Sequence, residues 1–278
     1  MVEGVRRFVG RLWLLSGLPI GLALVFLPPS GRLLFFTAAV FLETGHSLSP
    51  IVMAWTHRGF RPLMLARPGK YLLLPLAVFA LALGVGIITS LGWTSYLPGP
   101  HHSKKITDLS NPFPIVVWVY LIWNGYHFGM QNFGVLSLCR HKPRSARRRQ
   151  IDMFLCLAGT ALGMYALPML AGSQSLALLC VGVFSFNHWL VAIGLASRVS
   201  RHTWVFTVAM LVAGAVGFVW MIPTSNGPMI QVIPVIICAR MGLGFIHFLY
   251  DRWVWKLSDP LVRATIGRDL LRQREAGS

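Results

Sequence analysis

Eight long apolar runs divide this 278-residue sequence, and they constrain its fold more than any other feature. A helix needs about 20 mainly apolar residues to cross the hydrocarbon core of a bilayer. The runs reach that length, and 12% of all residues are charged, whereas a soluble domain carries about 25%. We therefore predict an all-α, polytopic membrane helix bundle that forms one integral membrane domain over 1–278. Its predicted spans are 10–28, 33–55, 71–93, 112–139, 152–172, 175–197, 203–222 and 229–250.

The distribution of basic residues predicts the orientation of the bundle. All but four of the 25 Lys and Arg residues fall in the N-terminal segment, in alternate loops or in the C-terminal tail. Since cytoplasmic loops are enriched in Lys and Arg, both termini are predicted to be cytoplasmic, in a multi-pass protein of the bacterial inner-membrane type. The net charge of +17 has the same origin, so the expected partner is the lipid bilayer and not nucleic acid. The tail, 252–278, is expected at the cytoplasmic interface as an amphipathic helix.

Four histidines recur in alternate apolar runs. His46, His127, His188 and His247 lie in the second, fourth, sixth and eighth runs, and the other four runs contain no histidine. Alternate helices run in the same direction, so the four imidazoles are expected at similar depth. Polar side chains inside a membrane are costly and usually face the bundle interior. The pattern predicts a metal site built from facing helices, although any one such histidine can also serve as a hydrogen-bonding contact between helices.

Carboxylate, amide and aromatic side chains accompany these histidines. Glu43 and Asn124 each precede a histidine by three residues, and Asp251 follows His247 by four, so each shares a helix face with its histidine. We predict catalytic roles for Glu43 and Asp251. Amides of this kind fix the tautomer of a ligating histidine. The expected second shell or pocket consists of Asn124, Tyr126, Gln131, Asn187, Trp123, Trp189 and His57.

Three of these residues have simpler interpretations. Glu43 could be a protonated side chain bonded to a neighbouring helix. Asp251 lies near the predicted cytoplasmic end, where Arg240, Arg252 or the Arg58–Arg61 loop could pair with it. His57 stands beside Arg58 at the predicted interface, where solvation is the expected outcome.

The donor set limits the chemistry. Imidazole and carboxylate together suit iron, zinc or manganese, and a site inside lipid implies a lipophilic substrate such as a carotenoid, quinone, sterol or acyl chain. With Fe²⁺, an open coordination position allows oxidation or oxidative cleavage by O₂. With zinc, a bound water hydrolyses a lipid amide or ester, with Glu43 as the general base. Haem ligation in an electron-transfer subunit, a proton or ion pathway, and a subunit role in a larger membrane complex stay open.

One segment carries a resemblance to a known family. Tyr126-His127-Phe128-Gly129, within a bundle that holds several intramembrane histidines, resembles the Brp/Blh group of bacterial β-carotene 15,15′-dioxygenases. The resemblance implies histidine-bound ferrous iron and oxidative cleavage of a carotenoid. That family has a Pro-His-Gly segment and a closely spaced histidine pair, where this sequence has Glu43-Thr-Gly-His46 and His247-Phe-Leu-Tyr-Asp251. The bundle is also similar to the ceramidase-like zinc hydrolases of membranes, although their His-x-x-x-His is missing.

Overall fold

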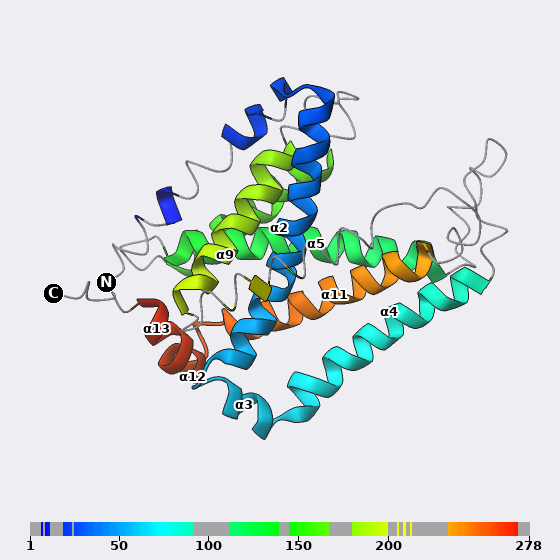
Figure 1. The fold of residues 1–278 in the computed structure, drawn as a ribbon. Coiled ribbons are helices and arrows are strands. Elements are labelled where there is room, and N and C mark those ends of the chain that lie inside the picture. The colour runs from blue at the N-terminus through cyan, green and yellow to red at the C-terminus, as the bar shows by residue number, and fades with distance from the viewer. Residues whose placement is uncertain are drawn as a thin grey trace.

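The computed structural model describes residues 7, 9–11, 19–23, 25–91, 112–138, 145–166, 180–199, 205, 208–209, 212 and 233–271. Every regular element among them is a helix, which confirms the predicted all-α class (Figure 1). The predicted span 10–28 lies partly, and 203–222 mostly, outside the described residues.

The other six predicted spans coincide with helices whose ends differ by several residues. The closest agreement is at 112–139, which the structure forms as α5 from Pro112 to Leu138. Short π-helical turns, labelled η, precede α4 and α9, follow α6 and separate α12 from α13. The elements are α2 Pro29–Thr56, α3 Arg61–Ala66, η1 Gly69–Leu73, α4 Leu74–Leu91, α5 Pro112–Leu138, α6 Ala146–Ala161, η3 Leu162–Ala166, η4 Val181–Phe186, α9 Asn187–Val199, α11 Ile233–Val254, α12 Pro260–Val262, η6 Arg263–Gly267 and α13 Arg268–Leu271.

Side-chain caps fix where two of the helices begin. The Ser145 hydroxyl accepts a hydrogen bond from the N–H of Arg148 at the start of α6, 3.4 Å away. The Asp259 carboxylate accepts one from the N–H of Leu261 at the start of α12, at 2.9 Å. The first N–H groups of a helix have no partner within it, so both caps satisfy donors that would otherwise need water.

Helices α4 and α11 pack side by side along most of their length (Figure 1). Two glycines allow this close approach. A Cβ on Gly86 would lie 2.8 Å from the Cβ of Cys238 and 2.9 Å from the carbonyl oxygen of Pro234, and one on Gly242 would lie 3.0 Å from the Phe79 ring. Small residues at helix contacts are typical of membrane bundles, where backbones approach closely in the absence of a hydrophobic driving force.

The four helices that carry the histidines meet where two directions cross. Helix α2 packs against α9 and also contacts α11, which in turn contacts α5. Figure 1 shows α2 and α9 side by side, steeply inclined to α5 and α11, so the described helices are not a simple array of parallel rods. The crossing brings side chains from distant parts of the sequence into one small volume.

The C-terminal segment packs against one end of the helices. Val262, Ile266 and Leu270 are almost completely buried in an apolar cluster with Phe60 and Met64. The segment α12–α13, predicted as part of an amphipathic interfacial helix, therefore turns its apolar side towards the protein. Trp253 and Trp255 pack at the edge of the same cluster.

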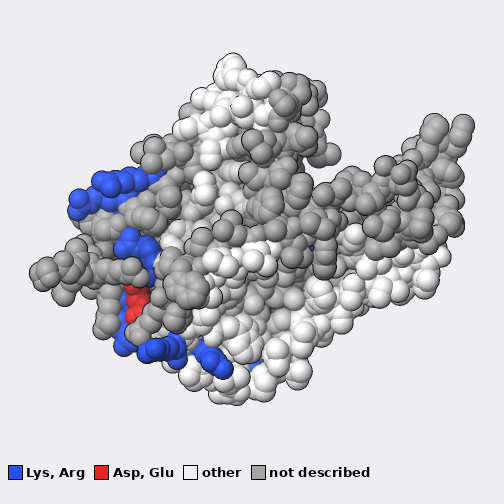
Figure 2. Space-filling model, in the orientation of Figure 1, with Lys and Arg blue, Asp and Glu red and all other residues white. Residues whose placement is uncertain are grey.

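The surface is apolar over the long helices and basic at one end. Large apolar side chains of α4 and α5 are exposed, among them Leu81, Leu91, Trp118 and Ile122. By length and composition two of the described helices could cross a membrane, Gly69–Leu91 and Pro234–Val254. The Lys and Arg side chains in Figure 2 gather at the end where α12 and α13 lie. The eight-span topology is not confirmed as a whole by these observations and stays a prediction.

Candidate metal centre

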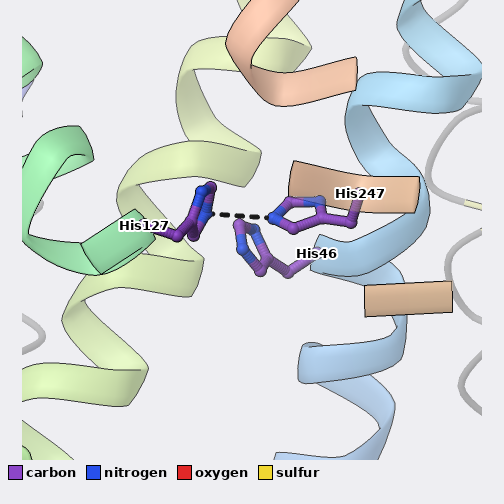
Figure 3. A group of neighbouring side chains, drawn as sticks. All are labelled: His46, His127 and His247. Carbon is purple, nitrogen blue, oxygen red and sulfur yellow. Dashed lines mark hydrogen bonds between the residues drawn. The ribbon is translucent and has the colours of Figure 1, made fainter. Parts of the chain in front are cut away.

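The structure brings the four histidines of the alternate apolar runs together, each from a different helix. His46 comes from α2, His127 from α5, His188 from α9 and His247 from α11. All four side chains are buried, with 2% to 8% of their surface exposed. Figure 3 shows the imidazoles of His46, His127 and His247 converging on one point. The alternation of histidines in the sequence therefore corresponds to a single cluster.

The ring nitrogens of the cluster lie at close and similar distances. The Nε2 atoms of His46 and His188 are 3.1 Å apart, and those of His127 and His247 are 3.2 Å apart. One nitrogen from each of His46, His127 and His247 lies within 4.8 Å of the other two. The His46 ring is in edge contact with His188 and with His247, at centroid distances of 4.7 and 4.4 Å.

These spacings fit a shared metal ion. With metal–nitrogen bonds of about 2.0–2.1 Å, neighbouring ligand nitrogens are about 3.4 Å apart in a tetrahedral site and about 3.0 Å apart in an octahedral one. The observed 3.1 and 3.2 Å fall between these two values. Histidines 46, 127 and 247 could hold a metal ion. His188 is not one of these three, and its Nε2 atom lies next to that of His46.

Two further observations concern the state of the ring nitrogens. The Nδ1 atom of His247 lies 3.1 Å from the backbone carbonyl of Ser47, to which it can only donate. This hydrogen bond places the proton on Nδ1 and leaves the Nε2 lone pair of His247 available to a metal. The Nδ1 atom of His46 is buried without a hydrogen-bond partner among the described residues. Buried polar atoms are normally paired, so Nδ1 of His46 could take a ligand as well as Nε2.

Two phenylalanines hold the imidazoles in place. The Phe128 ring stacks on His188 with a centroid distance of 3.7 Å and an interplanar angle of 21°. The Phe248 ring lies over His127 at 4.5 Å and 32°. Both phenylalanines are buried, so they limit ring rotation and exclude water. Phe128 directly follows His127 in the sequence and Phe248 directly follows His247, and this adjacency is the signal in the sequence for their role.

Asp251 lies beside the cluster, as its spacing from His247 predicts. Its Oδ2 atom is 3.8 Å from Nε2 of His127, and the side chain is buried. This distance is too long for a hydrogen bond but allows one after a small side-chain rotation. The Asp251 carboxylate thus lies next to the histidine cluster but is not one of the side chains that could hold the metal ion.

Glu43 is bonded to Arg240 and does not face the histidine cluster as a ligand or general base would. Its carboxylate forms an ion pair with the guanidinium of Arg240, which also donates to the Thr44 hydroxyl at 3.3 Å. The pair links α2 to α11. The predicted bond of Glu43 to a neighbouring helix is present, but it is an ion pair and not the contact of a protonated carboxyl group. The ion pair of Asp251 with Arg240, raised as an alternative, does not form.

The predicted surrounding residues differ in how far they are buried. Asn187 is buried beside His188, and the side-chain oxygen of Gln131 is buried without a partner among the described residues. Trp123 and Tyr126, in contrast, are exposed and contact each other at a ring distance of 6.5 Å. Asn124 and Trp189 are partly buried, and the Trp189 ring packs on Phe186.

His57 is the one predicted surrounding residue that has a separate environment of its own. Its Nδ1 atom accepts hydrogen bonds from the backbone N–H groups of Gly59 and Phe60, at 3.2 and 3.1 Å. Its Nε2 atom lies 3.1 Å from the carboxylate of Asp269 in α13. The expectation that His57 is solvated is wrong, because the C-terminal segment folds back over the end of α2 and buries it.

No protein-family model, curated protein or solved structure matches this chain. The interpretation of the site therefore depends on its own geometry.

Proposed function

We propose that this protein is a membrane metalloprotein that binds one transition-metal ion through His46, His127, His188 and His247. We propose further that it is an oxidase or oxygenase that oxidises or cleaves a lipophilic substrate. The convergence of four buried imidazoles from four helices, with nitrogens 3.1 and 3.2 Å apart, is the observation that supports the proposal most. Uncharged imidazoles in contact gain little from one another, whereas a metal ion would bind all of them.

The membrane part of the proposal combines the fold with the charge distribution. Exposed apolar side chains cover α4 and α5, and two helices are long and apolar enough to span a bilayer. The exposed basic side chains gather near the C-terminal ends of α2 and α11, as expected for a cytoplasmic face (Figure 2). We propose the full eight-span topology with both termini cytoplasmic, in a bacterial inner membrane.

The cluster favours a non-haem metal. Two histidines that ligate one haem stand on opposite faces of a porphyrin, whereas these imidazoles are in direct contact with one another. Imidazole donors suit iron, zinc, copper and nickel. The resemblance of Tyr126-His127-Phe128-Gly129 to the Brp/Blh dioxygenases favours ferrous iron among them. When bound, ferrous iron would activate O₂ for the oxidation of the substrate.

The residues around the cluster would each contribute to such a reaction. The Ser47 carbonyl keeps the Nδ1 proton of His247 in place, and Phe128 and Phe248 fix two of the rings and exclude water. Asp251 is the candidate to accept or return a proton, because its carboxylate is buried 3.8 Å from His127. A carotenoid or another extended apolar molecule would reach the site from the surrounding lipid.

A zinc-dependent hydrolase of lipid amides or esters is the second candidate, and the position of Asp251 favours it. Such an enzyme needs a general base beside the metal-bound water. Glu43, the base predicted from the sequence, is held by Arg240. The role would therefore pass to Asp251.

Elemental analysis and an optical spectrum of the detergent-purified protein test the proposal. We expect about one metal ion per chain and no Soret band. Iron supports the oxygenase, zinc supports the hydrolase, and a Soret band contradicts the non-haem site. Absence of stoichiometric metal, together with unchanged folding of a His127→Ala/His188→Ala double variant, would refute the metal site.

A further inference from the structure

A partly buried ion pair between α2 and α11 has no role in the proposed metal site. The guanidinium of Arg240 is bonded to the Glu43 carboxylate and donates to the hydroxyl of Thr44 at 3.3 Å. The side chains of Arg240 and Glu43 are 21% and 23% exposed, so the pair is accessible at the protein surface. We call these three side chains the polar subsite.

Stability alone does not account for this pair. Transferring two charges out of water costs about as much as their attraction returns, and well-packed apolar residues are often more stabilising. Charged side chains within membrane helices are correspondingly rare and usually mark a binding site or a pathway. Arg240 is the single Lys or Arg within the eight predicted spans, apart from those at their ends.

The chemistry of the polar subsite defines what it can bind. A guanidinium carries five N–H donors, and among the described residues Arg240 contacts one oxygen of Glu43 and one of Thr44. Because Glu43 already neutralises the guanidinium, a carboxylate ligand would add a second negative charge beside it. A hydroxyl group avoids this repulsion, since its oxygen accepts from Arg240 while its hydrogen is donated to Glu43.

The polar subsite is next to the histidine cluster on both of its helices. Glu43 precedes His46 by three residues on α2, which is a rise of about 4.5 Å on the same face. Arg240 precedes His247 by seven residues on α11, which is two turns and again the same face. A molecule held at the polar subsite would thus extend its apolar chain past the imidazoles.

We propose that Arg240 and Glu43 bind the hydroxyl end of a lipophilic substrate and present the adjoining part of its chain to the histidine cluster. The role as a substrate site rests on the proposed function, but the binding itself does not. The predicted substrate class is a neutral lipid alcohol, and a fatty acid or a plain hydrocarbon is excluded.

The test measures saturable binding of radiolabelled hexadecanol, hexadecanoate and hexadecane to the full chain in nanodiscs, with and without added metal. Wild-type protein is expected to bind the alcohol at least tenfold more tightly than the acid or the alkane. Arg240→Gln is expected to weaken alcohol binding at least tenfold. Arg67→Gln, which removes an exposed arginine at the basic end, is the matched control and is expected to bind normally.

Two outcomes overturn the polar subsite: equal binding of alcohol and alkane by the wild type, or equal alcohol binding by wild type and Arg240→Gln. If Arg240→Gln does not fold, the Glu43→Gln/Arg240→Gln double variant leaves no unpaired charge and replaces it in the same comparison. Metal content is measured in the same samples. Alcohol binding by a chain that takes up no metal would support the polar subsite and contradict the proposed enzyme, which separates the two failures.

Discussion

Two buried histidine environments in this protein differ in how completely their polar atoms are satisfied. At the end of α2, His57 accepts two backbone N–H groups on one nitrogen and faces the Asp269 carboxylate with the other. In the cluster, the imidazoles of His46, His127, His188 and His247 contact mainly one another, and Nδ1 of His46 has no partner among the described residues.

The difference separates a structural histidine from a set of candidate ligands. Because Nδ1 of His57 accepts two hydrogen bonds, its proton is on Nε2 and is donated to Asp269, so the ring needs nothing more. In the cluster, each pair of Nε2 atoms 3.1 or 3.2 Å apart can share only one proton. We infer that the His57 ring holds the C-terminal segment in place, whereas the cluster has nitrogens that could bind a cation.

The largest expected effect is on metal content when two cluster histidines are removed. Partners that only support a metal ligand are each worth about 10- to 100-fold in affinity, and a ligand is worth more. His127→Ala/His247→Ala should therefore weaken metal binding by at least about 10⁴-fold, measured by elemental analysis after dialysis against a competing chelator. His57→Ala is the matched control and should keep its metal; equal loss from both variants would contradict the distinction.

Metal removal is the next largest effect. A ligand present at about 1,000 times its Kd stabilises the folded state by about 4 kcal/mol. Removing the metal from the wild type with a chelator should lower the midpoint temperature of thermal unfolding, and added metal should restore it. The same treatment should shift His57→Ala equally and leave His127→Ala/His247→Ala unchanged. A shift in that double variant would place the metal elsewhere.

The histidine cluster could be predicted from the sequence because the patterns that indicate it lie within the individual apolar runs. Apolar runs give the helices, and the alternation of His46, His127, His188 and His247 gives a common direction, so no knowledge of packing is needed. The partners of Glu43 and His57 could not be predicted. Asp269 is 212 residues from His57, and their contact depends on how the C-terminal segment docks.

Backbone details account for the other differences. The π-helical turn Val181–Phe186 precedes Asn187 and shifts the face on which His188 lies, and no pattern in the apolar run 175–197 indicates it. The acceptor for His247 is the backbone carbonyl of Ser47. Every residue has such a carbonyl, so the sequence carries no signal for this hydrogen bond. Trp123 and Tyr126 flank His127 in sequence, yet the helix turns them to the exposed side.

Removing the His57 ring should reduce stability without affecting metal. His57→Ala removes the Nδ1 acceptor of the Gly59 and Phe60 N–H groups and the ring's hydrogen bond to Asp269, and each such bond is worth about 0.5–1.5 kcal/mol. The Phe60 N–H keeps the backbone carbonyl of residue 57 as a second acceptor at 3.1 Å. We expect the free energy of unfolding to fall by about 2–3 kcal/mol in a denaturant titration followed by circular dichroism. Asp269→Asn keeps an acceptor for Nε2 and should lose about 1 kcal/mol. Arg58→Ala, an exposed neighbour, should change little; a loss as large as that of His57→Ala would mean that the ring is not the cause.

The smallest expected effect is on metal affinity when the aromatic ring that stacks on His188 is removed. Phe128→Leu removes the ring that stacks on His188 at 3.7 Å, and aromatic pairs are worth about 0.5–1.5 kcal/mol beyond the area they bury. If that stacking orients a ligand, metal affinity should fall by about fivefold, which a competitive chelator titration can resolve. Phe133→Leu alters another buried phenylalanine of α5, whose ring lies 5.9 Å from the Arg149 guanidinium. It should lower the free energy of unfolding and leave metal affinity unchanged. Equal metal affinities in the two variants would show that His188 is oriented by its helix alone.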